Sequence, residues 1–117
     1  MLQVNSNMKD CIELCWECRT ACQNTLFTHC LEEGGAHLES GHVRIMADCV
    51  QICQAAADSM TRNSPVHQAI CAACAEICEA CAVSCEELEG EHMKKCARLC
   101  RDCADSCRTM GEMKQAA

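Results

Sequence analysis

The sequence predicts an all-α protein, an antiparallel up-down-up-down four-helix bundle with a Cys-lined core. Three observations lead to this prediction: four stretches of helical composition, the few Gly and Pro residues that separate them, and cysteines that repeat three and four positions apart. A chain of 117 residues is short for two separate cores, so we expect residues 1–117 to form one domain. Short connections between long helices favour antiparallel neighbours.

The Gly and Pro breakers set the expected helix boundaries. We expect helices from Ser6 to Glu33, from about Ser40 to Arg62, from Pro65 to Glu89 and from Glu91 to Met110. Ser64 before Pro65 is a helix start signal, because a hydroxyl caps free amides and proline at the first helical position loses no hydrogen bond. Gly111 suits a helix end.

Cysteine occupies one face of each predicted helix. Leu, Ile, Val and Phe account for only 18 of the 117 residues, whereas 16 residues are Cys. Spacings of three and four are those of heptad core positions, so each helix turns a line of sulfur toward the bundle axis. The residues in this pattern are Cys11, Cys15, Cys18, Cys22, Cys49, Cys53, Cys71, Cys74, Cys78, Cys81, Cys85, Cys96, Cys100, Cys103 and Cys107. Cys30 falls outside the pattern and needs a register slip to reach the axis.

Facing lines of thiols predict a site for several metal ions. Residues three or four apart on a helix have Cβ atoms about 5 to 6 Å apart, which suits two sulfurs that bind one soft ion. The second helix extends its line with His42 and Met46, both of them metal-ligand types. We therefore expect the 16 cysteines, His42, Met46 and His92 to be metal ligands.

The charge of a buried thiolate core indicates which ion it holds. Zn²⁺ with four thiolates per ion would give about four sites of charge −2 each, which leaves about −8 in a dry core. Cu⁺ held by thiolates that each bridge two ions approaches about one ion per Cys and leaves the core nearly neutral. We expect multiple Cu(I) ions per chain.

The two ends of the predicted bundle differ in composition. The end with the first and third connections gathers His29, His37, His42, His92, Met46 and Met93, and the other end gathers Met8, Met60, Met110, Met113 and His67. We expect the His-rich end to be the mouth through which Cu⁺ enters, and the Met-rich end to pack shut. His37 and His67 are expected to be solvated turn residues rather than ligands.

Charge and composition argue against several classes of function. A net charge of −7, with one Trp, one Phe and no Tyr, argues against a nucleic-acid partner. No run of 18 apolar residues is present and Met1–Asp10 is polar, so we expect a cytoplasmic protein that does not bind a membrane. No constellation of nucleophile, His and carboxylate indicates an enzyme.

Two alternatives use the same cysteines. A zinc-binding structural bundle would need its metal to fold, although zinc sites usually draw Cys from loops. A thiol redox buffer would cycle pairs of Cys to disulfides. Helicity of the metal-free chain separates the first alternative from a metal store.

Four segments carry a resemblance to a known family: CIELCWECRTAC at 11–22, HLESGHVRIMADCVQIC at 37–53, ICAACAEICEACAVSC at 70–85 and CARLCRDCADSC at 96–107. With these segments the chain resembles the cytosolic copper storage proteins, which are bacterial cysteine-rich four-helix bundles. The resemblance implies a homotetramer in which each bundle binds many Cu(I) ions and loads through one open end. The chain departs from the family at His42, where cytosolic members carry Cys, so fewer ions are expected at the mouth. We expect a copper chaperone or a copper enzyme as protein partner.

Overall fold

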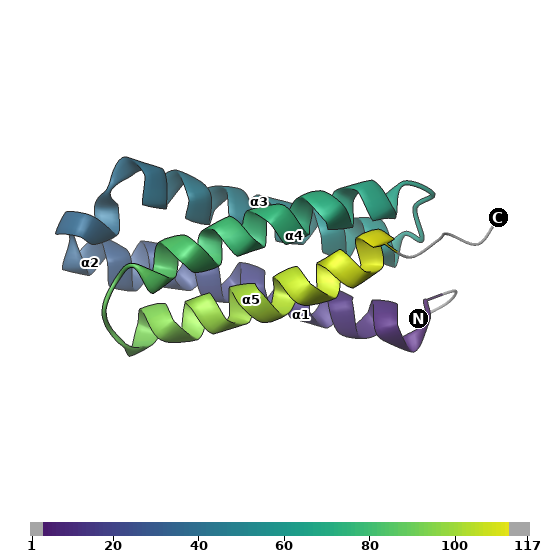
Figure 1. Cartoon of the computed structure of the whole chain (residues 1–117), viewed down its shortest axis with the longest axis horizontal. Helices are drawn as coiled ribbons and strands as arrows, with labels where there is room; N and C mark the ends of the chain where they lie inside the picture. The colour runs from purple at the N-terminus through teal and green to yellow at the C-terminus, as the bar shows by residue number, and fades with distance from the viewer. Residues whose placement is uncertain (1–3, 113–117) are drawn as a thin grey trace.

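The computed structural model describes residues 4–112, which form a bundle of four helical rods (Figure 1). The first rod is continuous and consists of α1 (Ser6–Asn24), a π-helical segment η1 (Thr25–Cys30) and α2 (Leu31–Glu33). A 3₁₀ turn, η2 (Gly35–Leu38), leads to α3 (Ser40–Thr61), and α4 (His67–Glu86) and α5 (Glu91–Glu112) complete the bundle. Among the described residues all regular structure is helical, which confirms the predicted fold class.

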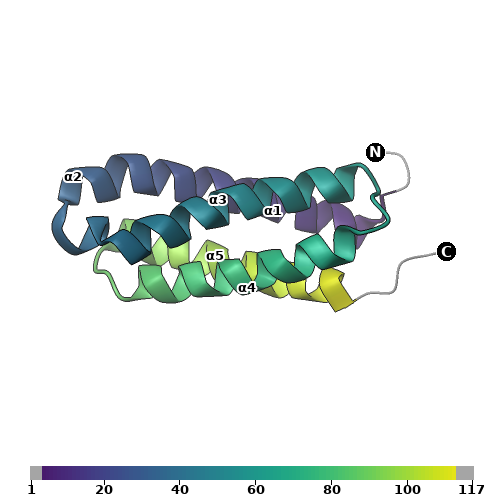
Figure 2. The ribbon, with the colours of Figure 1, turned by 90° about the horizontal axis from the view of Figure 1, so that it is seen from above.

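The rods run alternately up and down along the long axis of a body that measures 49 × 21 × 17 Å. Helix α1 packs against α3 and α5, and α4 packs against the same two helices. Figures 1 and 2 show that the first rod ends at α2, and α3 begins, beside the connection between α4 and α5, whereas the connection between α3 and α4 lies at the opposite end. The end of the bundle formed by α2, η2 and the α4–α5 connection is called the connection end below.

The π-helical segment explains how Cys30 reaches the bundle axis. In η1 the Leu31 amide donates to the carbonyl of Leu26, five residues back, so the turn contains one residue more than an α-helical turn. The extra residue shifts the heptad register between Cys22 and Cys30, and both side chains are completely buried. The register slip that the sequence required is therefore present, within one unbroken rod.

The predicted boundaries of the third helix were wrong by two to three residues. Helix α4 begins at His67 rather than Pro65, because the Ser64 hydroxyl accepts from the Val66 amide at 3.3 Å and the Ser64 carbonyl accepts from the His67 amide at 3.3 Å. These two bonds make a turn ahead of the helix. At its other end α4 stops at Glu86, three residues before the predicted end.

The prediction that Gly111 ends the last helix was also wrong, because α5 continues to Glu112. A Cβ atom at Gly111 would lie 3.0 Å from the backbone nitrogen of Ala72 on α4. A side chain there would press α5 away from α4, so glycine at this position allows the close approach of the two helices. Met113 lies outside the described residues.

Helix α4 is long and apolar enough to cross a membrane by length and composition alone, with a mean hydropathy of 1.4 over its best window. This is weak evidence for a span, since the core helix of a soluble protein passes the same test. The apolar character comes largely from Ala and from cysteines that face the interior of the bundle. On its outer face Glu79 accepts from Arg108 of α5 at 2.7 Å.

Deletion of exposed Thr28 should be tolerated, because it removes the extra residue of the π-helical turn and restores an ordinary α-helical register. We expect an unchanged or higher melting temperature by circular dichroism, and a Cys30 that stays unreactive to an alkylating reagent in the folded protein. Deletion of exposed Thr20 is the control. It changes the helical register of the residues that follow, and no π-helical turn precedes Cys22 that could absorb this change. Rapid alkylation of Cys30 in the Thr28 deletion would contradict this account.

Candidate metal centre

The cysteine sulfurs form a connected row along the bundle axis. All 16 cysteines are free and buried, and 15 of them have no exposed surface at all. Cys22 is the most connected member: its Sγ lies 3.8 Å from that of Cys49, 4.0 Å from Cys81, and 3.5 Å from both Cys96 and Cys100. Four helices thus contribute sulfur to one point on the axis.

From Cys22 the row continues toward the chain termini. Cys49 lies 3.8 Å from Cys78, and Cys78 lies 3.5 Å from Cys53. Cys53 in turn lies 4.0 Å from Cys103. The row ends in the contacts Cys103–Cys15 at 3.8 Å, Cys15–Cys107 at 3.5 Å and Cys107–Cys11 at 3.7 Å. No gap separates one end of this sulfur row from the other.

Three overlapping groups of four sulfurs have the spacing of a metal site, with all four Sγ atoms of a group within 4.8 Å of one another. The groups are Cys15, Cys74, Cys103 and Cys107; Cys18, Cys53, Cys78 and Cys103; and Cys18, Cys22, Cys49 and Cys100. A metal–sulfur bond of about 2.3 Å places two sulfurs about 3.8 Å apart in a tetrahedral site and about 4.6 Å apart in a linear one. The spacing suits both geometries. Cys18 and Cys103 each belong to two groups, which is the arrangement that bridging thiolates require.

Cys30 stands beyond the sulfur row at the connection end, among mixed ligand types. Its Sγ lies 3.7 Å from Nε2 of His42 and 3.8 Å from Sδ of Met93. His42 is only 4% exposed, and its Nδ1 lies 2.7 Å from the Ser84 hydroxyl. If Nδ1 carries the proton and donates to Ser84, the Nε2 lone pair faces Cys30, as a metal-ligating imidazole requires.

The start of α3 positions His42. The Glu39 carboxylate caps the helix by accepting from the amides of Gly41 at 2.9 Å and His42 at 3.1 Å. These bonds hold the pKa of Glu39 below its usual range. Burial, together with the nearby charge of His37, lowers the pKa of His42, which therefore stays neutral and able to bind metal at pH 7.

The other two predicted ligands at this end differ in placement. Met46 is completely buried on α3, one turn beyond His42. His92 is exposed, and its ring lies beside that of His29 with 4.7 Å between centroids. The completely buried residue at the start of α5 is Met93, which the sequence analysis left out of the ligand set. Its distance of three residues from Cys96 was the signal that could have placed it on the sulfur face.

The opposite end of the bundle is closed by buried Met8, Met60 and Met110, as predicted. The prediction that His67 is a solvated turn residue was wrong. This side chain is 5% exposed, and its Nδ1 lies 3.0 Å from the Ser64 carbonyl, to which it can donate. His67 thereby ties the start of α4 to the turn before it.

Burial and thiol–thiol contacts shift the pKa values of the cysteines in both directions. Burial raises the pKa of Cys30 to about 11 and that of Cys71 to about 12. Hydrogen bonds from Cys107 and Cys15 lower the pKa of Cys11 to about 4, because they stabilise its thiolate. Metal ions that bind the protonated thiols must displace their protons.

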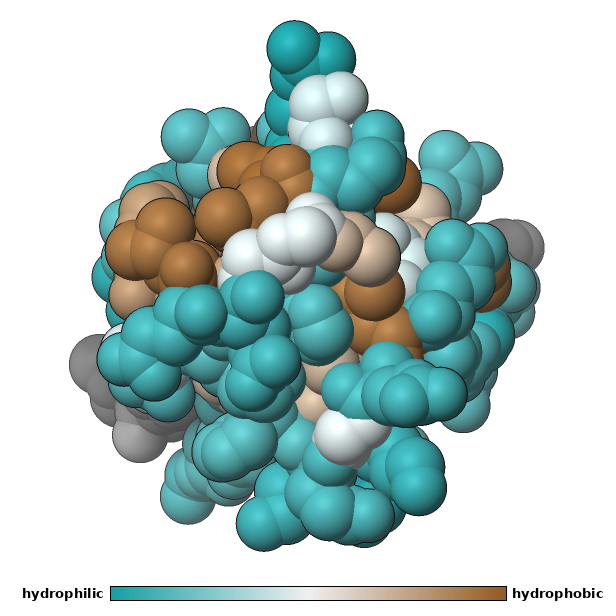
Figure 3. All heavy atoms as spheres, turned by 90° about the vertical axis from the view of Figure 1, so that its left-hand side faces the viewer, coloured by the Kyte–Doolittle hydropathy of each residue, from teal (hydrophilic) through white to brown (hydrophobic). Residues whose placement is uncertain are grey.

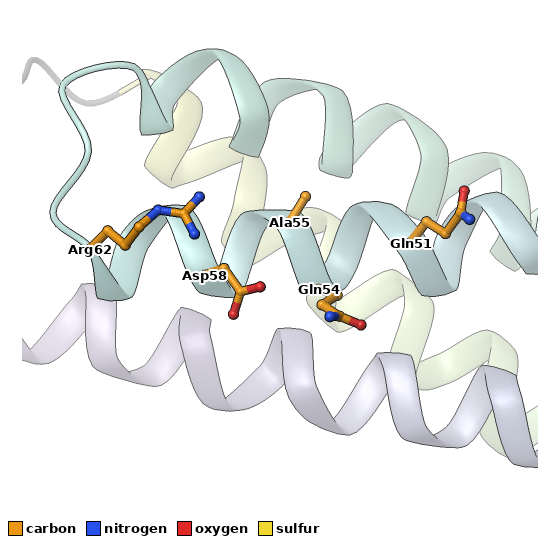
Figure 4. Close-up of a pocket in the computed structure, with 5 residues that line it drawn as sticks. All are labelled: Gln51, Gln54, Ala55, Asp58 and Arg62. Carbon is orange, nitrogen blue, oxygen red and sulfur yellow. The ribbon is translucent and has the colours of Figure 1, made fainter.

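One pocket on the outer surface of α3 is lined by residues of a different kind. Figure 4 shows a shallow surface pocket of about 480 Å³ lined by Gln51, Gln54, Ala55, Asp58 and Arg62. Gln54 accepts from the guanidinium of Arg19 at 3.1 Å and so links α3 to α1. None of the residues that line this pocket is a soft ligand, so the pocket does not suit Cu(I).

A sequence model of the copper storage proteins matches residues 4–112, which is nearly the whole chain. The chain belongs to the copper storage protein family. This copper storage protein is 45% identical over 100 residues to the uncharacterized cysteine-rich protein YhjQ of Bacillus subtilis, and the match covers 86% of the chain and 92% of YhjQ.

Two solved structures are similar to this copper storage protein. The Cu(I)-bound copper storage protein BsCsp3 has 40% sequence identity and a TM-score of 0.84, over 91% of the chain described here and 99% of BsCsp3. The apo form of copper storage protein 3 from Bacillus subtilis has 44% identity and a TM-score of 0.79, over 88% of the chain and 97% of that structure. The fold is therefore shared with a metal-loaded and a metal-free relative.

Above pH 9 the metal-free bundle should lose stability. Thiols with raised pKa values, such as Cys30 and Cys71, stay protonated in the folded state up to about pH 11 to 12, whereas unfolded thiols ionise near pH 9. Their contribution to the free energy of unfolding is complete below pH 9 and is lost as the pH rises through the folded pKa. The reason is that in this range the unfolded chain binds fewer protons than the folded chain. Thiols with lowered pKa values oppose this loss only until the unfolded thiols are ionised as well, and above about pH 10 they add no opposing slope.

Thermal unfolding of the reduced, metal-free protein at pH 7.5, 9 and 10.5, followed anaerobically by circular dichroism, checks this expectation. A melting temperature that is constant or rises between the last two values would contradict it.

Proposed function

We propose that this protein stores Cu(I), with many ions per chain held by cysteine thiolates along the axis of the bundle. The observation that carries the proposal is the unbroken sulfur row, in which neighbouring Sγ atoms from four helices lie 3.5–4.0 Å apart. The proposed ligands are the 16 cysteines, with His42 and Met46 at the connection end. His92 is left out because its side chain is exposed and lies beside His29 rather than beside a sulfur.

The ion is selected by the charge of the site. All 16 cysteine side chains are buried, so each thiolate that forms in the core needs a compensating charge nearby. A monovalent ion shared between bridging thiolates supplies about one positive charge per thiolate, and soft thiolate and thioether ligands favour Cu(I) over harder ions. Divalent zinc with four thiolates leaves each site negative.

The zinc-binding structural bundle stays a testable alternative, since the three groups of four sulfurs suit tetrahedral zinc as well. A metal that serves as scaffold would be needed for folding. Against this role, a relative of the chain has the same fold in its apo form. The thiol redox buffer is the other alternative. It requires free thiols that can pair, and all 16 thiols are free in this structure.

We also propose that the protein acts in the cytoplasm, as a homotetramer, and exchanges copper with a chaperone or a copper enzyme. A reducing compartment keeps 16 buried thiols available for metal. Trp16 and Leu99 line a mostly apolar surface groove between α1 and α5, where a second subunit could pack. Catalysis forms no part of the proposal.

Titration of the reduced protein with Cu(I) under nitrogen, against a chromogenic competing chelator, tests the proposed store. We expect roughly one Cu(I) per Cys to bind before the chelator is coloured. Cys22→Ser should lower this number by more than one ion, because Cys22 contacts four other sulfurs. Ala75→Ser, a buried position of α4 that carries no sulfur, is the matched control. Saturation at one or two ions would overturn the proposal.

Removal of all metal should leave the protein helical, because Ala, Met and protonated thiols fill the core in their own right. We expect the helical signal in circular dichroism to survive dialysis against a strong chelator, and the melting temperature to rise when Cu(I) is added back. Loss of the helical signal on chelation would instead support the zinc-binding structural bundle.

A further inference from the structure

Three histidines meet at the connection end, outside the sulfur row. His29 lies on η1, His37 on η2 and His92 in the first turn of α5. The ring of His29 is adjacent to both of the others, with 5.2 Å between its centroid and that of His37 and 4.7 Å to that of His92. The end of the first rod and the following turn thus meet the start of α5 with three imidazoles, at the end of the bundle seen in Figure 3.

Two of these imidazoles have buried nitrogens without a hydrogen bond. Nε2 of His29 and Nε2 of His37 are inaccessible to solvent, and neither has a partner among residues 4–112. A buried polar atom without a partner costs roughly 1 to 3 kcal/mol, so native proteins rarely leave one. Two such atoms on adjacent rings indicate that another group satisfies them. The chain itself supplies no acceptor or donor for either atom within the described residues.

The separations of the His29 ring from the other two rings match those of a histidine metal site. A metal–nitrogen bond of about 2.0–2.1 Å places the ion about 3.2 Å from the ring centroid, and two rings at the tetrahedral angle then have centroids about 5.2 Å apart. The observed separations of 4.7 and 5.2 Å agree with this value. In the structure as it stands the three imidazoles are not among the groups whose ligand atoms all lie within 4.8 Å of one another. The rings must therefore turn about their side-chain torsions to bring three nitrogens to one ion.

We propose that His29, His37 and His92 form a second metal site, free of thiols, for a divalent transition-metal cation of the class of Zn²⁺. Imidazole suits borderline divalent ions, whereas the thiolate row suits Cu(I), so the two sites differ in the ion they select. Three histidines leave a fourth position for water, and the net charge of −7 favours a cation at the surface. The site is independent of the copper store, because it shares no ligand with the 16 cysteines or His42.

Occupation of the site would join three segments through their side chains: the end of the first rod, the η2 turn and the start of α5. Gly34 and Gly35 precede His37 with positive φ values of 67° and 53°, so the chain changes direction at these glycines after the first rod. An ion that binds the folded arrangement alone raises the melting temperature. The proposed site therefore acts as a brace at the connection end.

The test uses protein whose thiolates are already filled with Cu(I), so that added Zn²⁺ cannot enter the sulfur row. We expect isothermal titration calorimetry under nitrogen to show about one Zn²⁺ per chain, and the ¹⁵N resonances of His29, His37 and His92 to shift together. His29→Gln and His37→Gln should each raise the Kd for Zn²⁺ at least tenfold and abolish the rise in melting temperature. His67→Gln at the opposite end is the matched control and should bind Zn²⁺ as the unchanged protein does.

Equal Zn²⁺ affinity in His29→Gln and in the unchanged protein would overturn the proposal, as would a shift confined to one histidine. Failure of the copper store is recognised separately, from the copper content of the protein before Zn²⁺ is added. If the protein does not hold Cu(I), Zn²⁺ is added to the metal-free protein instead. A joint shift of the three histidine resonances that is lost in His29→Gln then supports the zinc site, and no joint shift overturns it.

Discussion

The structure depends on the burial of 16 thiols along a single axis. A thiol packs as a small apolar group while it is protonated, and becomes a costly buried charge when it ionises. The same residues therefore form a stable core without metal and a ligand set with it. This dual character explains why the helices carry so few of the aliphatic side chains that fill most bundles, and why Ala and Met fill the space between sulfurs.

Helical geometry turns that composition into a continuous site. Spacings of three and four keep sulfur on one face of each rod, and antiparallel packing brings four such faces together. Cys22, Cys18 and Cys103 show the result, because each of them contacts sulfurs from more than one other helix. Shared contacts of this kind are what bridging ligands require, and they arise from the repeat rather than from any specialised loop.

Most of the fold and of the sulfur row could be predicted from the sequence, because heptad spacing states directly which face of a helix is buried. The need for a register slip at Cys30 could be predicted too, but a π-helical turn as its form could not. Features that depend on tertiary contacts were not predictable. The glycine at position 111 allows the close approach of Ala72 on α4. His67 is buried because its ring packs against the turn at Ser64, whose carbonyl lies 3.0 Å from Nδ1. Met93 was predictable from its spacing to Cys96, whereas exposure of His92 follows from the helical face that Met93 occupies.

Location of the ions in a crystal of the anaerobically Cu(I)-loaded protein, by anomalous diffraction at the copper absorption edge, tests the central claim most directly. The account predicts a string of copper peaks along the axis from Cys11 and Cys107 to Cys30 and His42, each peak within bonding distance of at least two ligand atoms. One or two peaks confined to the surface or to a single end, with the sulfurs of Cys22, Cys49 and Cys100 unbound, would contradict it.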